Sequence, residues 1–144
     1  MALKVELKPG EKVVIGECVV TNGDQRTRFL IEGQSPILRE KDIMTANRAD
    51  TPAKRIYLAV QYMYTSRDPA SFHDEYFALI RDMMKAAPSA IPFIENINNH
   101  ILTGEMYKAL KQAAKLMAYE KDLIDNAKRV AGLRQGRQPD FESA

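Results

Sequence analysis

Leu38-Arg39-Glu40-Lys41-Asp42-Ile43-Met44-Thr45 is the stretch along which the hydrophobic period of this chain changes. Before it, apolar and polar residues alternate, as in half-buried strands; after it, apolar residues recur every three or four positions, as in amphipathic helices. Thr51 followed by Pro52 is a typical helix start. The sequence therefore predicts an α+β chain, with a β-strand module over residues 1–45 and a helical module over residues 46–134.

About five short antiparallel strands are predicted in the first module. Leu3, Val5 and Leu7 alternate with charged residues, which predicts a strand with one buried face. Gly16 divides the valine-rich residues 12–20 into two short strands or one bent strand. Because five short strands enclose little core and leave edges unpaired, we expect the module to pack on the helices and to form a two-fold homodimer.

A tight hairpin is predicted at Asn22-Gly23, because a type I′ turn needs positive φ at both central residues. The strand after this turn would point Arg26 and Arg28 to the solvent. Its expected core-facing residues are Thr27, Phe29 and Ile31. A turn over residues 33–36 then leads to a last short strand that ends at Arg39.

Four helices are predicted in the second module. The first begins at Pro52, and the other three have expected ranges of 68–87, 89–102 and 105–133. The fourth carries a seam of apolar residues at alternating spacings of four and three, interrupted by Glu120. Such a seam could pack on the other helices or on a partner helix. Residues 135–144 contain glycine, proline and charge, and we expect a flexible tail there.

Composition excludes several classes of protein and favours none strongly. The 21 basic and 19 acidic residues give a net charge of +2, so overall charge does not by itself indicate a nucleic-acid partner. The single cysteine, Cys18, excludes an intrachain disulfide and a multi-cysteine zinc site. No apolar run approaches the length of a membrane span or forms a signal-peptide core, which predicts a cytoplasmic protein without membrane attachment.

The candidate catalytic residues do not form a recognisable constellation. His73 lies in an H-x-E pattern, but the zinc deaminases that share it need two further cysteines. We expect His73 in the first turn of a helix, His100 on a polar face or at a helix end, and Cys18 as a packed strand thiol. The sequence therefore predicts a binding protein that is not an enzyme and that uses no cofactor or metal.

Four ordered segments resemble the FlbT family of flagellar regulators. They are Leu7-Lys8-Pro9-Gly10-Glu11, Asn22-Gly23-Asp24, Leu38-Arg39-Glu40-Lys41-Asp42-Ile43 and Thr51-Pro52-Ala53-Lys54-Arg55-Ile56-Tyr57. The resemblance covers about residues 3 to 130. It implies a cytoplasmic, post-transcriptional regulator that acts on the untranslated leader of flagellin mRNA, usually as a repressor and in some members as an activator. It also implies a small flagellar partner, FlaF.

The strand module also resembles the carbon storage regulator family of RNA-binding proteins. The similar segments are Gly10-Glu11 with Ile15-Gly16, and Arg39-Glu40 with Ile43. Those proteins are intertwined β dimers whose first and last strands form the RNA edge. The resemblance places the functional arginine of that family on Arg39 and leaves only Lys8 of its arginine pair. With the exposed strand arginines, the predicted RNA contacts are Lys8, Arg26, Arg28 and Arg39.

A second function stays open beside RNA binding. The helical half could dock a flagellar protein partner, and any effect on RNA would then be indirect. Exposed arginines on a strand module also have a structural explanation, because charged edge residues prevent edge-to-edge aggregation. For Arg39 the corresponding alternative is an ion pair with Glu40, Asp42 or another nearby carboxylate.

Overall fold

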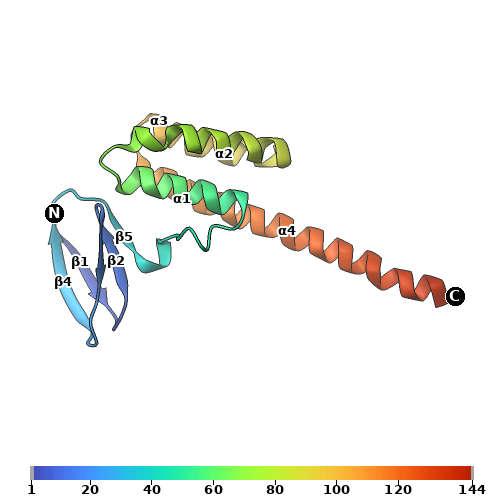
Figure 1. The fold of residues 1–144 in the computed structure, drawn as a ribbon, viewed down its shortest axis with the longest axis horizontal. Helices are drawn as coiled ribbons and strands as arrows, with labels where there is room; N and C mark the ends of the chain where they lie inside the picture. The colour runs from blue at the N-terminus through green and yellow to red at the C-terminus, as the bar shows by residue number, and fades with distance from the viewer. Residues whose placement is uncertain (1, 144) are drawn as a thin grey trace.

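The computed structural model describes residues 2–143, with side chains described for residues 2–133. A small strand module is followed by a helical module that ends in a long last helix (Figure 1). The strands are β1 (Ala2–Leu7), β2 (Lys12–Ile15), β3 (Cys18–Thr21), β4 (Thr27–Glu32) and β5 (Ile37–Arg39). The predicted α+β class and the five short strands before residue 45 are confirmed.

The five strands form two small antiparallel sheets. One contains β1 and β4, and the other has the order β3-β2-β5. A two-residue turn at Gly16-Glu17 joins β2 to β3, so residues 12–20 form two strands rather than one bent strand. Gly16 has a φ of 60°, as glycine does at the first central position of a type II′ turn.

The hairpin predicted at Asn22-Gly23 is wrong. β3 and β4 do not pair, because the chain crosses there from one sheet to the other, and Gly23 does not have positive φ.

The Asn22 side chain instead holds the crossing. Its amide nitrogen donates to the backbone oxygens of Leu7 at 3.2 Å and of Lys8 and Gln25 at 2.8 Å each. Its oxygen accepts from the Thr27 hydroxyl at 2.8 Å. Thr27 is therefore exposed at the crossing and does not face the core as predicted.

The helical module contains four α-helices. They are α1 (Pro52–Thr65), α2 (His73–Ala86), α3 (Ile91–Leu102) and α4 (Met106–Ser143), with short 3-10 turns at Glu40–Asp42, Pro69–Phe72 and Pro88–Ala90. α1 packs against α2 and α4, and α3 packs against α4. α4 runs beyond the end expected at Leu133. The flexible tail predicted for residues 135–144 falls outside the described side chains and stays a prediction.

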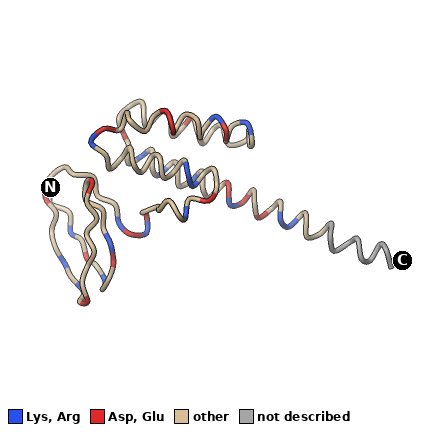
Figure 2. Tube along the Cα trace, viewed as in Figure 1, with Lys and Arg blue, Asp and Glu red and all other residues tan. Residues whose placement is uncertain are grey.

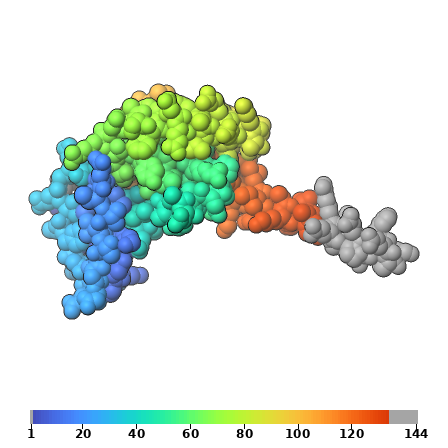
Figure 3. Space-filling model, viewed as in Figure 1, coloured from blue at the N-terminus to red at the C-terminus, as the bar shows by residue number. Residues whose placement is uncertain are grey.

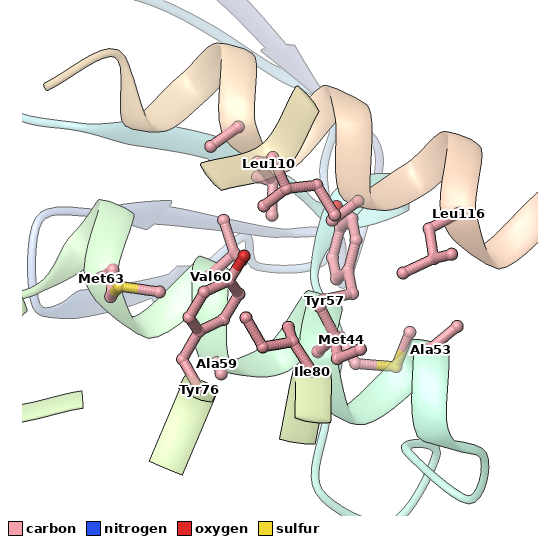
Figure 4. Close-up of a cluster of buried hydrophobic side chains, with 14 of the residues drawn as sticks. Met44, Ala53, Tyr57, Ala59, Val60, Met63, Tyr76, Ile80, Leu110 and Leu116 are labelled. Atoms are coloured by element: carbon pink, nitrogen blue, oxygen red, sulfur yellow. The ribbon is translucent and has the colours of Figure 1, made fainter. Parts of the chain in front are cut away.

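Two hydrophobic clusters lie in the described chain. The smaller one fills the strand module with Val5, Leu7 and Val13, against which Phe29 and Ile31 pack. The larger one is built by the helices (Figure 4). It also includes Val14, Leu38 and Met44. Because adjacent strand residues point to opposite faces, β2 places Val13 in one cluster and Val14 in the other, and so ties the two modules together.

α4 changes role at Glu120. Before it, Ala109, Leu110, Ala113 and Leu116 are buried against the other helices. Glu120 is itself buried and accepts hydrogen bonds from Thr51 and from the backbone N–H of Ala53, at the start of α1. After it, α4 projects from the body of the molecule (Figure 3), and Ile124, Val130 and Leu133 are exposed. Of the described helices, none is both long and apolar enough to cross a membrane.

Candidate nucleic-acid interface

Three of the four predicted RNA contacts lie together on the strand module. Arg28 is directly opposite Glu6 in the β1–β4 ladder, and Arg26 and Lys8 immediately flank the paired residues. All three basic side chains are exposed. The Glu6 carboxylate lies 3.4 Å from Arg26, which neutralises part of this patch. The structure therefore gathers these cations on one solvent-facing surface but mixes them with acidic charge, as the blue and red segments of Figure 2 show.

Arg39 lies elsewhere. It lines a surface pocket of about 400 Å³ that also touches Leu3, near the beginning of β1. Lys8 follows the opposite end of β1, five residues or roughly 17 Å further along the strand. Leu3 and Lys8 also point to opposite faces of that strand. The structure therefore separates Arg39 from the other three predicted contacts.

The pocket around Arg39 combines cations with aromatic rings. Its charged and aromatic lining residues, which together we call the Arg39 pocket, are Arg39, Lys41, Asp42, Tyr64, Tyr107 and Lys111. The end of β5 and the 3-10 turn after it supply the first three, α1 supplies Tyr64, and the first turns of α4 supply Tyr107 and Lys111. Residues far apart in the sequence thus meet where the strand module joins the helices.

Two tyrosine hydroxyls hold the wall of the Arg39 pocket in place. The Tyr64 hydroxyl donates to the backbone oxygen of Ile37 at 3.1 Å and accepts from its N–H at 3.2 Å. The Tyr57 hydroxyl donates to the backbone oxygen of Asp42 at 2.7 Å. Burial raises the pKa of both phenols, so they remain protonated donors in neutral solution. β5 and the following turn are therefore fixed to α1 on both sides of Arg39.

The cations of the pocket differ in their partners. Lys111 lies 3.8 Å from the Asp42 carboxylate, and its ammonium is 5.1 Å from the centre of the Tyr107 ring. Its neighbour Tyr107, and to a lesser extent the charge of Asp42, raise the pKa of Lys111. Within the described part of the chain, Arg39 and Lys41 form no ion pair. The ion pair considered for Arg39 with Glu40 or Asp42 is therefore absent there, and its guanidinium is available to a ligand.

This arrangement suits a single-stranded nucleic acid chemically. Tyr107 is 44% exposed, so a base can reach the part of its ring that Lys111 and Tyr64 leave uncovered. Arg39, Lys41 and Lys111 line the same pocket and carry donors suited to phosphate and to base edges. Tyr107, Lys41 and Lys111 were not among the contacts predicted from the sequence. The signal for two of them is Tyr107-x-x-x-Lys111, a spacing that places both side chains on one face of a helix.

The other polar candidates lie outside this pocket. His73 begins α2, as expected, and His100 lies in the last turn of α3, 3.5 Å from Glu105. Cys18 is on a strand, but it is exposed, so the expectation of a packed thiol is wrong. Across the side chains that the structure describes, no three His, Cys, Asp or Glu residues gather as a metal site would require.

Comparison with known proteins gives the family. The model of the flagellar protein FlbT matches residues 3–124, which include the strand module, α1 to α3 and the packed half of α4.

The chain belongs to the FlbT family.

Curated relatives support the assignment over most of their length. The chain is 59% identical over 124 residues to the "Probable flagellum biosynthesis repressor protein FlbT 1" of Bradyrhizobium diazoefficiens, covering 85% of each chain. It is 52% identical over 124 residues to a probable FlbT repressor of Rhodopseudomonas palustris, covering 86% of this chain and 98% of the relative. It is 38% identical over 127 residues to the "Flagellum biosynthesis repressor protein FlbT" of Caulobacter vibrioides, covering 86% and 90%.

No solved structure matches the chain. The family assignment thus rests on sequence, and it confirms the resemblance to FlbT drawn from the four ordered segments. Its relatives are named repressors of flagellum biosynthesis, which supports a regulator of flagellar synthesis.

Proposed function

We propose that this protein is a post-transcriptional regulator of flagellin synthesis that binds the untranslated leader of flagellin mRNA in the cytoplasm. Bound leader RNA would be less accessible to ribosomes or more exposed to decay, and the regulator would act without catalysis. The names of its relatives support the regulatory role. The observation that carries RNA binding is the Arg39 pocket, in which an exposed aromatic ring lies among three cations.

The proposed mode of binding follows from the two surfaces described above. An unstacked base lies on Tyr107, and Arg39, Lys41 and Lys111 contact the adjoining phosphates. The second patch, formed by Lys8, Arg26 and Arg28, would lie along a longer RNA and contribute phosphate contacts without reading bases. Because both patches include carboxylates, the number of phosphate contacts is small, and the affinity should fall only moderately with salt.

The test measures the affinity of purified protein for a flagellin leader RNA at several salt concentrations. The Tyr107→Ala variant should bind roughly 5- to 150-fold more weakly, since base stacking contributes about 1–3 kcal/mol. Phe77→Ala is a matched control, because Phe77 is another helical aromatic residue and is 45% exposed. Equal affinity of the two variants for the leader would contradict this site, and absence of leader binding by the wild type would contradict direct RNA regulation.

A second function is favoured by the exposed half of α4. Beyond Glu120, Ile124, Val130 and Leu133 offer apolar surface on a helix that projects from the body. Amphipathic helices of this kind dock into grooves or pair with partner helices. In this alternative the protein is an adaptor that binds a FlaF-like flagellar regulator through α4, and its effect on mRNA is indirect.

A further inference from the structure

β3 is an edge strand with an open side. Among the strands of the described residues it pairs with β2 alone, and all four of its residues, Cys18 to Thr21, are exposed. Val19 is 62% exposed and Val20 is 38% exposed. An edge with unpaired backbone groups and apolar side chains is a template for another strand. The open side of β3 is therefore a candidate interaction surface.

The turn at Gly16-Glu17 determines which backbone groups of β3 point outward. In a two-residue hairpin the flanking residues, here Ile15 and Cys18, exchange both backbone hydrogen bonds. Such pairs alternate along an antiparallel ladder, so Val20 is also bonded to β2. The N–H and C=O groups of Val19 and Thr21 therefore point away from β2, toward the open side, where an added antiparallel strand could pair with them.

β3 also lacks the protection that the other strands carry. Each of the other four contains at least one charged residue, whereas Cys18-Val19-Val20-Thr21 contains none. Charged edge residues oppose pairing with a second strand. Two identical uncharged edges can meet without like-charge repulsion. The charge pattern therefore favours a second copy of this chain as the occupant.

We propose that two copies pair through β3, antiparallel and about a two-fold axis. The product is a continuous six-stranded sheet of order β5-β2-β3-β3-β2-β5, with the two β5 strands roughly 24 Å apart. Paired strands four residues long bury too little surface for a stable dimer by themselves. The remaining buried surface comes from a groove of about 470 Å³ beside Val19, which the second copy would cover. The apolar walls of this groove include Met44, Tyr62 and Phe72. Tyr62 and Phe72 stack with ring centres 5.4 Å apart and give this wall a flat apolar surface.

The experiment measures the mass of the full-length protein in solution over a range of concentrations. At roughly 100 µM the wild type should have twice the chain mass of 16.3 kDa. Val19→Lys should raise the dimer dissociation constant at least roughly a hundredfold, because it brings a lysine from each copy into the paired edge, where the two like charges repel each other. Leu30→Lys is the matched control: Leu30 is 63% exposed on β4, and its substitution should leave the dimer intact.

A cross-link tests the strand alignment directly. In the Cys18→Ser background, cysteine introduced at Val19 should form an intermolecular disulfide if the two-fold axis lies between the two Val19 residues, and cysteine introduced at Val20 should do so if the axis lies between the two Val20 residues. The same change at Leu30 should not. A wild-type mass of one chain at high concentration, or a dimer that Val19→Lys leaves unchanged, would overturn the proposal. A dimer that only Leu30→Lys dissociates would move the interface to the β1–β4 sheet.

Discussion

The Glu120 carboxylate, on α4, accepts a 2.9 Å hydrogen bond from the backbone N–H of Ala53, in the first turn of α1 and 67 residues away in sequence. Its second oxygen accepts from the Thr51 hydroxyl, which in turn accepts from the N–H of Lys54 at 3.3 Å. A carboxylate from one helix thus completes the cap of another and offsets the partial positive charge at that helix end. This explains why a charged residue interrupts the apolar seam of α4.

Glu120→Ala should destabilise the protein by about 2 kcal/mol, because it leaves the buried Ala53 N–H without a partner. Denaturant unfolding followed by circular dichroism measures the loss. Glu95→Ala is a suitable control, since Glu95 is exposed on α3 and should change the free energy of unfolding by less than about 0.5 kcal/mol. If the two variants unfold alike, the cap contributes nothing to stability.

Arg39→Ala should weaken binding of the leader RNA by about 1–3 kcal/mol and leave folding nearly intact, because Arg39 is exposed and has no ion pair within the described residues. Arg39→Lys should recover only part of the loss if the guanidinium makes a bidentate contact. Affinity is measured at fixed salt beside Lys115→Ala, an exposed lysine on α4 outside the Arg39 pocket. RNA binding by Arg39→Ala equal to that of the control would remove Arg39 from the interface.

Deleting the chain from Lys121 onward should abolish binding of a FlaF-like partner while the protein stays folded. The last α4 residues buried in the core, Leu116 and Glu120, are retained in this variant. A pull-down with the partner, together with a thermal melt of the truncated protein, makes the comparison. Retained binding by the folded truncation would move the partner interface to the strand module or to α1–α3.

Glu105 should contribute to a loss of stability in acid. Hydrogen bonds from Lys108 and Thr103 lower the pKa of its carboxyl from 4.5 to about 2. Because the folded-state pKa is the lower one, the stabilisation is present above pH 4.5 and is lost as the pH falls toward 2. Glu105→Gln should therefore flatten the pH dependence of unfolding in that window. An unchanged acid profile, equal to that of Glu95→Gln, would contradict this contribution.

The sequence predicted what depends on local pattern. Alternation and helical spacing located the strands and the helix starts, because they reflect which face of each element is buried. Contacts between distant segments were not predictable in this way. Asn22-Gly23 has a hairpin signature, but the pairing of β4 with β1 takes the chain into another sheet. Glu120 was recognised only as an interruption, since its partner at Ala53 is set by packing.

In the candidate site, too, local pattern was predictable from the sequence and contacts between distant segments were not. Arg39 was predicted through a resemblance, whereas Tyr107 and Lys111 lie on a helix whose placement beside β5 no local pattern reveals. All four predicted contacts were placed together on the strand module, and the structure brings only Lys8, Arg26 and Arg28 close to one another. Their distance from Arg39 follows from the pairing of β1 with β4 and of β5 with β2.

One nitrogen atom makes three of the hydrogen bonds that hold the crossing between the two sheets. The amide nitrogen of Asn22 faces the three backbone oxygens of Leu7, Lys8 and Gln25, and an aspartate in its place would present only acceptors to them. Hydrolysis of this side-chain amide, to which an asparagine followed by glycine is chemically prone, would therefore convert three attractions into repulsions without adding or removing a residue. The amide that hydrolysis would attack is the one that holds the crossing by hydrogen bonds. The strand module therefore keeps its architecture only as long as this amide stays intact.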